Sequence, residues 1–110
     1  MPGHLEPISI NKLADSLTEA WDARDVVTAN DSVLRLIRVD GTMDWHHHEE
    51  DQLFVCWDGT FTVEVEGSPA IGLYPGDVLV VPKGAAHTTR SERVAYALMS
   101  IGVHTMARPK

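Results

Sequence analysis

Turn signals recur at short intervals along most of this 110-residue chain, and they leave room only for short strands. They occur at Asn30-Asp31, Asp40-Gly41, Asp58-Gly59, Gly67-Ser68-Pro69, Pro75-Gly76-Asp77 and Pro82-Lys83-Gly84. Asn, Asp, Gly and Pro favour turns because of their backbone preferences. Short β-branched runs between such turns are typical of an all-β sandwich or barrel. We therefore expect an all-β fold in which the chain after Ala23 consists of strands and turns.

The apolar runs between the turns predict both the strands and the core. Strands are expected over residues 26–29, 33–39, 61–66, 78–81 and 94–103. Alternating residues of a strand face the same side, and a wholly apolar run is typical of a strand buried on both sides. The residues that we expect to form the core are Phe61, Val63, Val65, Val78 and Val80.

Helical periodicity is confined to the beginning of the chain. Apolar residues recur at helical spacing between Ile8 and Trp21, and Ser9 or Asn11 is a suitable N-cap. A chain of this length is expected to form one domain. We expect an N-terminal arm and short helix over residues 1–22, a β-barrel domain over 23–104 and a C-terminal tail over 105–110.

The charge of the chain limits its partners. The net charge is -7, and no Lys or Arg occurs between Arg38 and Lys83, a stretch that carries many carboxylates. This balance argues against nucleic acid and against an anionic membrane as partners. A small-molecule ligand is therefore expected, and the acidic stretch favours a bound cation over a phosphorylated or carboxylate-rich substrate.

Cysteine usage and the N-terminal residues predict the compartment. Cys56 is the only cysteine, so an intrachain disulfide is excluded and a reducing cytosol is favoured. Residues 1–10 contain no apolar run of the kind found in secretory signals, and no stretch is long enough to span a bilayer. We expect a cytoplasmic protein.

Three histidines and a glutamine have the spacing of a metal site. His46 and His48 are two residues apart, so in a strand they face the same side while His47 faces the other. Gln52 follows four residues later, and His87 comes on a later strand. Imidazole suits zinc, copper, iron and nickel. The sequence therefore predicts a small metal-binding β-barrel.

Two motifs resemble those of the cupin superfamily. The first family motif has a Gly, a His-x-His, a Glu and a second Gly, and the second has a Gly, a Pro-x-Gly and a His. The matching residues here are Gly41, His46, His48, Gln52 and Gly59 for the first motif and Gly76, Pro82, Gly84 and His87 for the second. The chain departs from the pattern in three places. Gln52 replaces the usual Glu, Gly41 is one residue closer to the first His than is common, and Ser91 replaces a frequent Asn.

The resemblance implies a jelly-roll (double-stranded β-helix) cupin barrel with one short N-terminal helix. It is similar to the small single-domain bacterial cupins that are often labelled mannose-6-phosphate isomerase-like, a label that settles no substrate. By the same resemblance, the protein is expected to be a homodimer in which residues 8–29 form the dimer arm. One divalent transition metal (Fe, Mn, Ni or Zn) is expected, held by His46, His48, His87 and Gln52.

The role of Gln52 leaves alternatives open. Its amide oxygen is a poorer ligand than a carboxylate, so it either binds the metal directly or hydrogen-bonds a metal-bound water, which leaves a three-His site like that of thiol dioxygenases. A third alternative is that Glu49, Glu50 or Asp51 supplies a carboxylate. Residues 54 and 56 share the face of residue 52 in its strand. If that face is turned to the metal, Phe54 and Cys56 line the pocket, and we interpret Cys56 as a small apolar filler.

These features predict a metal-dependent enzyme of dioxygenase, isomerase, lyase or cyclase type that acts on a small organic molecule. The alternative is a non-catalytic cupin that binds a metal or a small ligand, and a further one is a scaffold whose site has decayed. The sequence nominates no general base. The nearby cations are Lys83 and Arg90 at the predicted mouth and Arg35, which is inward-facing in one register of its strand. We interpret them as surface charge.

Overall fold

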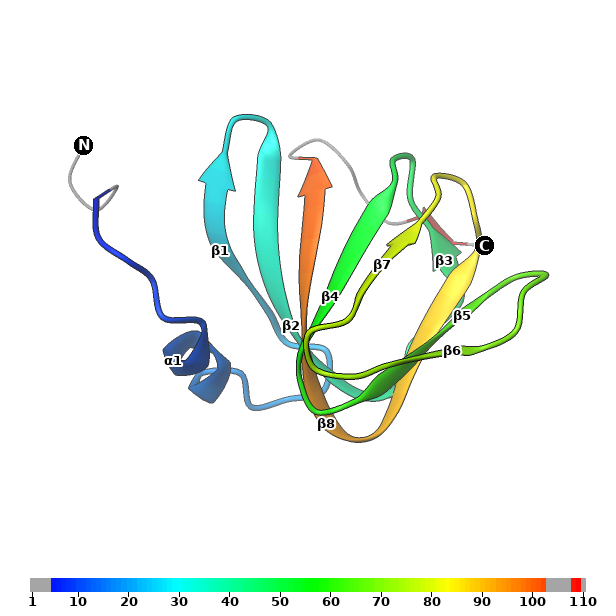
Figure 1. The fold of residues 1–110 in the computed structure, drawn as a ribbon, viewed down its shortest axis with the longest axis horizontal. Helices are drawn as coiled ribbons and strands as arrows, with labels where there is room; N and C mark the ends of the chain where they lie inside the picture. Colours follow the sequence, from blue (N-terminus) through cyan, green and yellow to red (C-terminus); the bar gives the residue numbers. More distant parts are fainter. Residues whose placement is uncertain (1–4, 103–107, 110) are drawn as a thin grey trace.

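The computed structural model describes residues 5–102 and 108–109, which form one short helix and a strongly bent β-sheet (Figure 1). The elements are α1 (Ile10–Asp15), β1 (Ala23–Ala29), β2 (Ser32–Thr42), β3 (His46–His47), β4 (Gln52–Asp58), β5 (Phe61–Val65), β6 (Ile71–Leu73), β7 (Val78–Val81), β8 (His87–Gly102) and β9 (Arg108–Pro109). The prediction of an all-β jelly roll with one short N-terminal helix is confirmed. No helix in the described residues is long and apolar enough to cross a membrane.

Strand β8 organises the sheet because it belongs to both of its layers. Residues 87–90 of this strand pair with β5, and residues 96–100 pair with β4 on one side and β2 on the other. The larger layer therefore has the order β1-β2-β8-β4-β7, and the smaller layer has the order β6-β5-β8-β3-β9. Figure 1 shows the bend, with the yellow first part of β8 beside β5 and the orange second part beside β2.

Two apolar clusters stabilise this arrangement. The inner cluster lies between the two layers, and its most buried members are Val39, Phe54, Cys56, Phe61, Val63, Leu73, Val81, Ala95 and Ala97. The outer cluster lies where α1 covers the larger layer, and it contains Ala14, Leu17, Leu36 and Leu98. Strand alternation explains the division, since Leu36 of β2 points outward while Ile37 packs against the inner cluster.

Helix α1 is shorter than the predicted periodic stretch. Ser9 is its N-cap, with the Ser9 hydroxyl accepting a hydrogen bond from the Lys12 amide, and the helix ends at Asp15. Trp21 has a φ of 66° and its amide donates to the carbonyl of Arg38 at 2.9 Å. The chain at Trp21 has therefore already left the helix and runs along β2. Its indole packs against the inner cluster, not against the outer cluster that α1 helps to form.

Two predicted boundaries are wrong. The Asp40-Gly41 pair is not a turn: it lies within β2, where Gly41 has a φ of 84° beside a shift in the pairing of β2 with β8. A β-bulge bends a strand in this way, and glycine permits the positive φ without steric cost. The last long strand begins at His87 and not at residue 94, because the segment after the Pro82-Lys83-Gly84 turn enters β8 directly.

The prediction that Val78 and Val80 belong to the core is also wrong. Their side chains are 58% and 50% exposed, whereas Val81 is buried. Among the described residues, strand β7 pairs only with β4. Its side chains point alternately to the two faces of the larger layer, so one side of the apolar run is exposed. Phe61 and Val63 are buried and Val65 packs against the inner cluster, as expected.

The C-terminal boundary stays a prediction, because residues 103–107 and 110 lie outside the described part of the chain. Within the expected tail, Arg108 and Pro109 form β9, which pairs with His46 and His47 of β3. The end of the chain thus lies beside the strand that carries the predicted metal ligands.

Candidate metal centre

Strand pairing brings the predicted imidazoles together. His46 of β3 lies directly opposite His87 of β8, and their ring centroids are 4.4 Å apart. His48 follows β3, with its ring centroid 5.2 Å from that of His46 and 5.6 Å from that of His87. One ring nitrogen from each residue lies within 4.8 Å of the others. His47, between them in sequence, is not part of this cluster.

The turn before β8 holds the two motifs against each other. Gly84 has a φ of 77°, which favours glycine, and its amide donates to the carbonyl of His48 at 2.8 Å. The Lys83 amide donates to the Asp51 carboxylate at 2.9 Å. Two hydrogen bonds donated by main-chain amides, one to a carbonyl and one to a side-chain carboxylate, thus tie the Pro-x-Gly turn to the loop after β3 and fix His48 relative to His87.

Hydrogen bonds to the backbone select the tautomers of two imidazoles. Nδ1 of His46 lies 2.9 Å from the carbonyl of Asp44, and Nδ1 of His87 lies 3.0 Å from the carbonyl of Ala85. A carbonyl only accepts, so Nδ1 is the donor in both pairs and Nε2 keeps its lone pair. Such backbone partners typically orient imidazoles that bind a metal.

Burial disfavours the charged forms of His48 and His87. Burial, and then the neighbouring His46 and His87, lowers the pKa of His48 from 6.5 to about 4. Burial also lowers the pKa of His87. Both ring nitrogens of His48 and Nε2 of His87 are buried without a hydrogen-bond partner in the described part of the chain. Neutral imidazoles with unshared lone pairs are the form that binds metals.

Gln52 is buried at the beginning of β4. Its side chain is only 1% exposed, and neither its amide oxygen nor its amide nitrogen has a hydrogen-bond partner among the described residues. An unsatisfied buried amide costs roughly 1–3 kcal/mol. This donor set fits a metal or a metal-bound water, which would satisfy the amide. Of the alternative carboxylates, Asp51 accepts the Lys83 amide and Glu49 lies 3.6 Å from Nε2 of His47.

Phe54 and Cys56 continue the face of Gln52 and are buried, and their role in lining a ligand pocket stays a prediction. The Phe54 ring stands edge-on to His87 with centroids 5.9 Å apart. The Cys56 thiol donates to the carbonyl of Gly59 at 3.1 Å, and burial, followed by Asp77 and Asp58, raises its pKa to about 11. A neutral buried thiol fits the apolar filler that we predicted. The predictions from sequence did not single out Met99, which lies opposite Phe54 in the inner cluster. Apolar residues at every second position, 95, 97, 99 and 101, are the sequence signal that places Met99 on the inner face.

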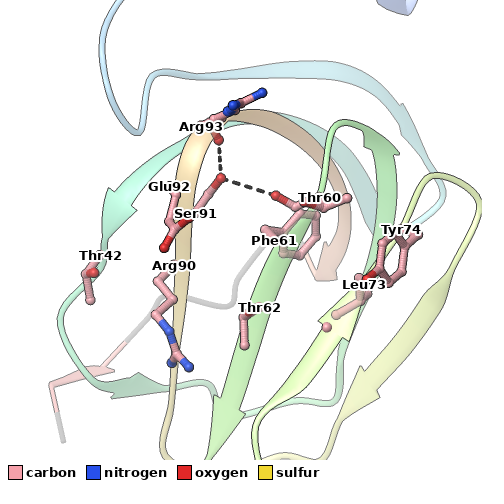
Figure 2. Close-up of a pocket in the computed structure, with 11 residues that line it drawn as sticks. Thr42, Thr60, Phe61, Thr62, Leu73, Tyr74, Arg90, Ser91, Glu92 and Arg93 are labelled. Carbon is pink, nitrogen blue, oxygen red and sulfur yellow. Dashed lines mark hydrogen bonds between the residues drawn. The ribbon is translucent and has the colours of Figure 1, made fainter.

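Arg90 does not lie at the mouth of this site. It is opposite Thr62 on the outer face of the smaller layer, where its guanidinium donates to Glu64 at 2.8 Å. Arg90 lines a separate open groove of about 720 Å³. Figure 2 shows this groove, with the Ser91 hydroxyl at its upper end within hydrogen-bonding reach of the carbonyls of Thr60 and Arg93. The His cluster faces the interior, so the groove and the cluster lie on opposite sides of the smaller layer.

The comparisons with known proteins agree with this fold and this cluster. A family model described as a cupin domain matches residues 33–101, and the chain therefore belongs to the cupin family. It is 32% identical to the uncharacterised protein YdbB of Bacillus subtilis (strain 168) over 80 aligned residues. The alignment covers 72% of this chain and 71% of YdbB. It is 25% identical to a cupin-2 domain protein from Shewanella frigidimarina, with a TM-score of 0.81 over 86% of this chain and 93% of the other. The protein is thus a small cupin similar to these bacterial ones.

Several enzymes share the fold at lower identity. A hydroquinone 1,2-dioxygenase, PnpCD, in complex with Cd²⁺ and 4-hydroxybenzonitrile, is 17% identical with a TM-score of 0.74 over 84% of this chain and 70% of that one. The DMSP lyase DddQ from Ruegeria pomeroyi is 19% identical, with a TM-score of 0.74 over 83% and 52% of the two chains. The polyketide cyclase RemF from Streptomyces resistomycificus is 16% identical, with a TM-score of 0.70 over 79% and 68%. At these identities the likeness shows the fold alone.

Proposed function

We propose that the protein binds one divalent transition metal through His46, His48 and His87 and uses it to act on a small organic molecule. The observation that carries the proposal is the convergence of three imidazoles whose ligand atoms lie within 4.8 Å of one another. The unpartnered nitrogens of His48 and His87 support it, because buried polar atoms normally find a partner. Gln52 is either a fourth ligand or the hydrogen-bond partner of a metal-bound water.

The residues of the chain itself would prepare the site. Asp44 and Ala85 hold two imidazoles in the tautomer that leaves Nε2 available, while Phe54 and the inner cluster keep water away from the buried side of the site. Iron, manganese, nickel or zinc at such a site supplies Lewis-acid polarisation or, with iron, electrons for dioxygenation. Proteins of the same fold include a dioxygenase, a lyase and a cyclase, which supports an enzymatic role without selecting a reaction.

Elemental analysis and metal titration of the untagged protein test this proposal. We expect close to one equivalent of iron, manganese, nickel or zinc in the purified protein, or uptake of one equivalent on titration. His87→Ala should abolish stable binding, whereas His47→Ala is the matched control and should retain it, because His47 lies outside the cluster. A parent protein that neither contains nor takes up these ions would refute the proposal and favour a scaffold.

A non-catalytic metal- or ligand-binding module is the second candidate. It is favoured by the neutral amide of Gln52 at the position where the cupin motif has a carboxylate, and by the position of Tyr96, which packs against the outer cluster. Tyr74, the other tyrosine, is 65% exposed beside the outer groove. Oxygen consumption or substrate turnover by metal-loaded protein separates the candidates. If metal binds but a broad screen of small organic substrates gives no turnover, the module is the better description.

We also propose that the protein forms a homodimer through its N-terminal segment. Large apolar side chains in this segment are exposed, among them Leu5, Ile8 and Val27, and β1 pairs only with β2 among the described strands. Light scattering during size exclusion tests this: the parent should be a dimer and Val27→Asp a monomer. Val94→Asp, at another exposed valine far along the chain, is the control and should stay dimeric. A parent that is monomeric at all concentrations would contradict the proposal.

A further inference from the structure

One arginine lies on the inner face of the larger layer. Arg35 of β2 is opposite Met99 of β8, and Met99 is in turn opposite Phe54 of β4. On the other side, Arg35 pairs with Asp25 of β1. The four residues form one row across neighbouring strands, and paired residues of a sheet share a face. Because Phe54 and Met99 belong to the inner cluster, the row is on the side that the His cluster occupies.

Strand alternation gives the same placement independently. Ile37 and Val39 follow Arg35 at two-residue spacing and pack in the inner cluster, whereas Leu34 and Leu36 pack in the outer cluster. The interpretation of Arg35 as ordinary surface charge therefore has to be revised. Among the described residues of the larger layer, Arg35 and Asp25 are the charged residues that the register places on this inner face, where Gln52 and Thr28 are polar and uncharged.

Arg35 is at the level of the metal centre and still reaches solvent. Phe54, in the same row, contacts the His87 ring edge-on. Two strand spacings, roughly 10 Å, separate the backbone of Arg35 from that of Phe54. The side chains of Arg35 and Asp25 are 36% and 55% exposed, so the pair lies at the open edge of the interior. A small molecule bound at the imidazoles would extend over Phe54 and Met99 toward this pair.

The ion pair leaves most of the guanidinium unused. Nε of Arg35 donates to Oδ1 of Asp25 at 2.7 Å, and its two Nη atoms make no hydrogen bond within the described residues. Asp25 thus fixes the plane of the guanidinium while its remaining donors stay available. A guanidinium presents these donors as a planar fork that matches a carboxylate.

We propose that Arg35 binds the carboxylate of the substrate, with Asp25 as a positioning residue. This inference rests on the proposed metal function and deepens it: the substrate class is a small organic monocarboxylate. Its apolar body would lie over Phe54 and Met99, and its other end would face the imidazoles. Arg35 is the one cation that the register places on the inner face of the larger layer among the described residues, so it would select one carboxylate. Phe54 and Met99 beside it would disfavour a second charge.

Titrations of metal-loaded protein with matched probes test the inference. The probes are benzoate, 4-hydroxybenzoate and hexanoate, each compared with its neutral amide by calorimetry. The parent should prefer at least one carboxylate over its amide, and Arg35→Gln should weaken carboxylate binding tenfold or more without changing amide binding or metal affinity. Arg35→Lys should retain part of the preference because the charge remains. Arg38→Gln is the control, since Arg38 is also ion-paired but lies on the outer face of the same strand.

The outcomes separate this inference from the proposed function. If metal binds and no carboxylate is preferred at millimolar concentration, or if Arg35→Gln binds the probes as the parent does, the role of Arg35 is refuted and the metal proposal stands. If the parent binds no metal but retains carboxylate binding that depends on Arg35, the metal proposal fails alone. Equal losses in Arg35→Gln and Arg38→Gln would show a general electrostatic effect and would also overturn the inference.

Discussion

His46 and His87 are direct partners across β3 and β8, and the pairing places their imidazole rings 4.4 Å apart. The two residues are far apart in sequence, and a strand of only two residues, β3, carries one of them. So short a strand has little pairing energy of its own. Its position depends on its neighbours, above all on the turn that precedes β8 and on the hydrogen bond from the Gly84 amide to His48.

Gly84→Ala should therefore weaken metal binding more than its effect on the fold suggests. At a φ of 77° an added Cβ costs roughly 1–2 kcal/mol of backbone strain, although it meets no atom within 4 Å. Relief of the strain would move the turn and break the hydrogen bond to His48. Gly67→Ala is the control, since Gly67 has a φ of 83°, equal free space and no contact with the cluster. We expect similar losses of unfolding free energy for both variants, and a loss of metal affinity only for Gly84→Ala. Equal metal affinities would contradict this coupling.

The metal-free protein should lose stability as the pH falls from about 6.5 toward 4. The pKa of His48 is lowered to about 4 in the fold from 6.5, so the unfolded chain takes up a proton first and acid favours unfolding. The stability present above pH 6.5 is lost through this window, by up to about 3 kcal/mol for such a difference in pKa. Urea titrations at several pH values in the presence of chelator measure it. His48→Asn should reduce this loss and leave the part that comes from His87, whose pKa is also lowered, whereas His47→Asn should keep the full loss.

Much of the fold was predictable because strand alternation and turn chemistry are local. The Asp58-Gly59 turn, the buried faces of β5 and the N-cap at Ser9 depend on residues close in sequence. The errors at Gly41 and at Val78 arose from tertiary context, because a glycine with positive φ serves a bulge as well as a turn. An apolar edge strand likewise resembles a buried one in sequence.

The candidate site was predictable only as a set of residue types. Spacing placed His46 and His48 on one face, but nothing in the sequence gives the register that sets His87 opposite His46. The same holds for Arg35, whose inner-face position follows from the pairing of β2 with β8. Register between distant strands depends on the packing of the whole sheet, which a local pattern does not encode.

Cys56 should be nearly inert in the folded protein. Its side chain is buried, and its pKa of about 11 compares with an ordinary value of 9.0. At pH 8 the thiolate fraction is therefore about 100-fold below that of an ordinary cysteine, before access is considered. Reaction with Ellman's reagent should be at least ~100-fold slower in native protein than in urea. A native rate close to the rate in urea would contradict the buried position of Cys56.

Gln52 gives the sharpest test of how the metal is held, because two substitutions have opposite expected effects. Gln52→Leu removes an amide that is buried without a partner in the described residues. The metal-free protein should therefore gain up to about 1–3 kcal/mol of unfolding free energy. The same variant should bind metal about tenfold more weakly or worse if the amide is a ligand, a loss that corresponds to ~1.4 kcal/mol. Thermal denaturation with chelator and competitive metal titration measure the two effects separately.

Gln52→Glu completes the comparison. A carboxylate at this position should tighten binding of a divalent metal if residue 52 contacts it directly, since the added negative charge offsets the charge of the ion. Unchanged affinity in Gln52→Glu, together with a modest loss in Gln52→Leu, would instead indicate that the amide hydrogen-bonds a metal-bound water. Unchanged affinity in both variants would remove Gln52 from the site and leave the three imidazoles as the whole of the protein's contribution to metal binding.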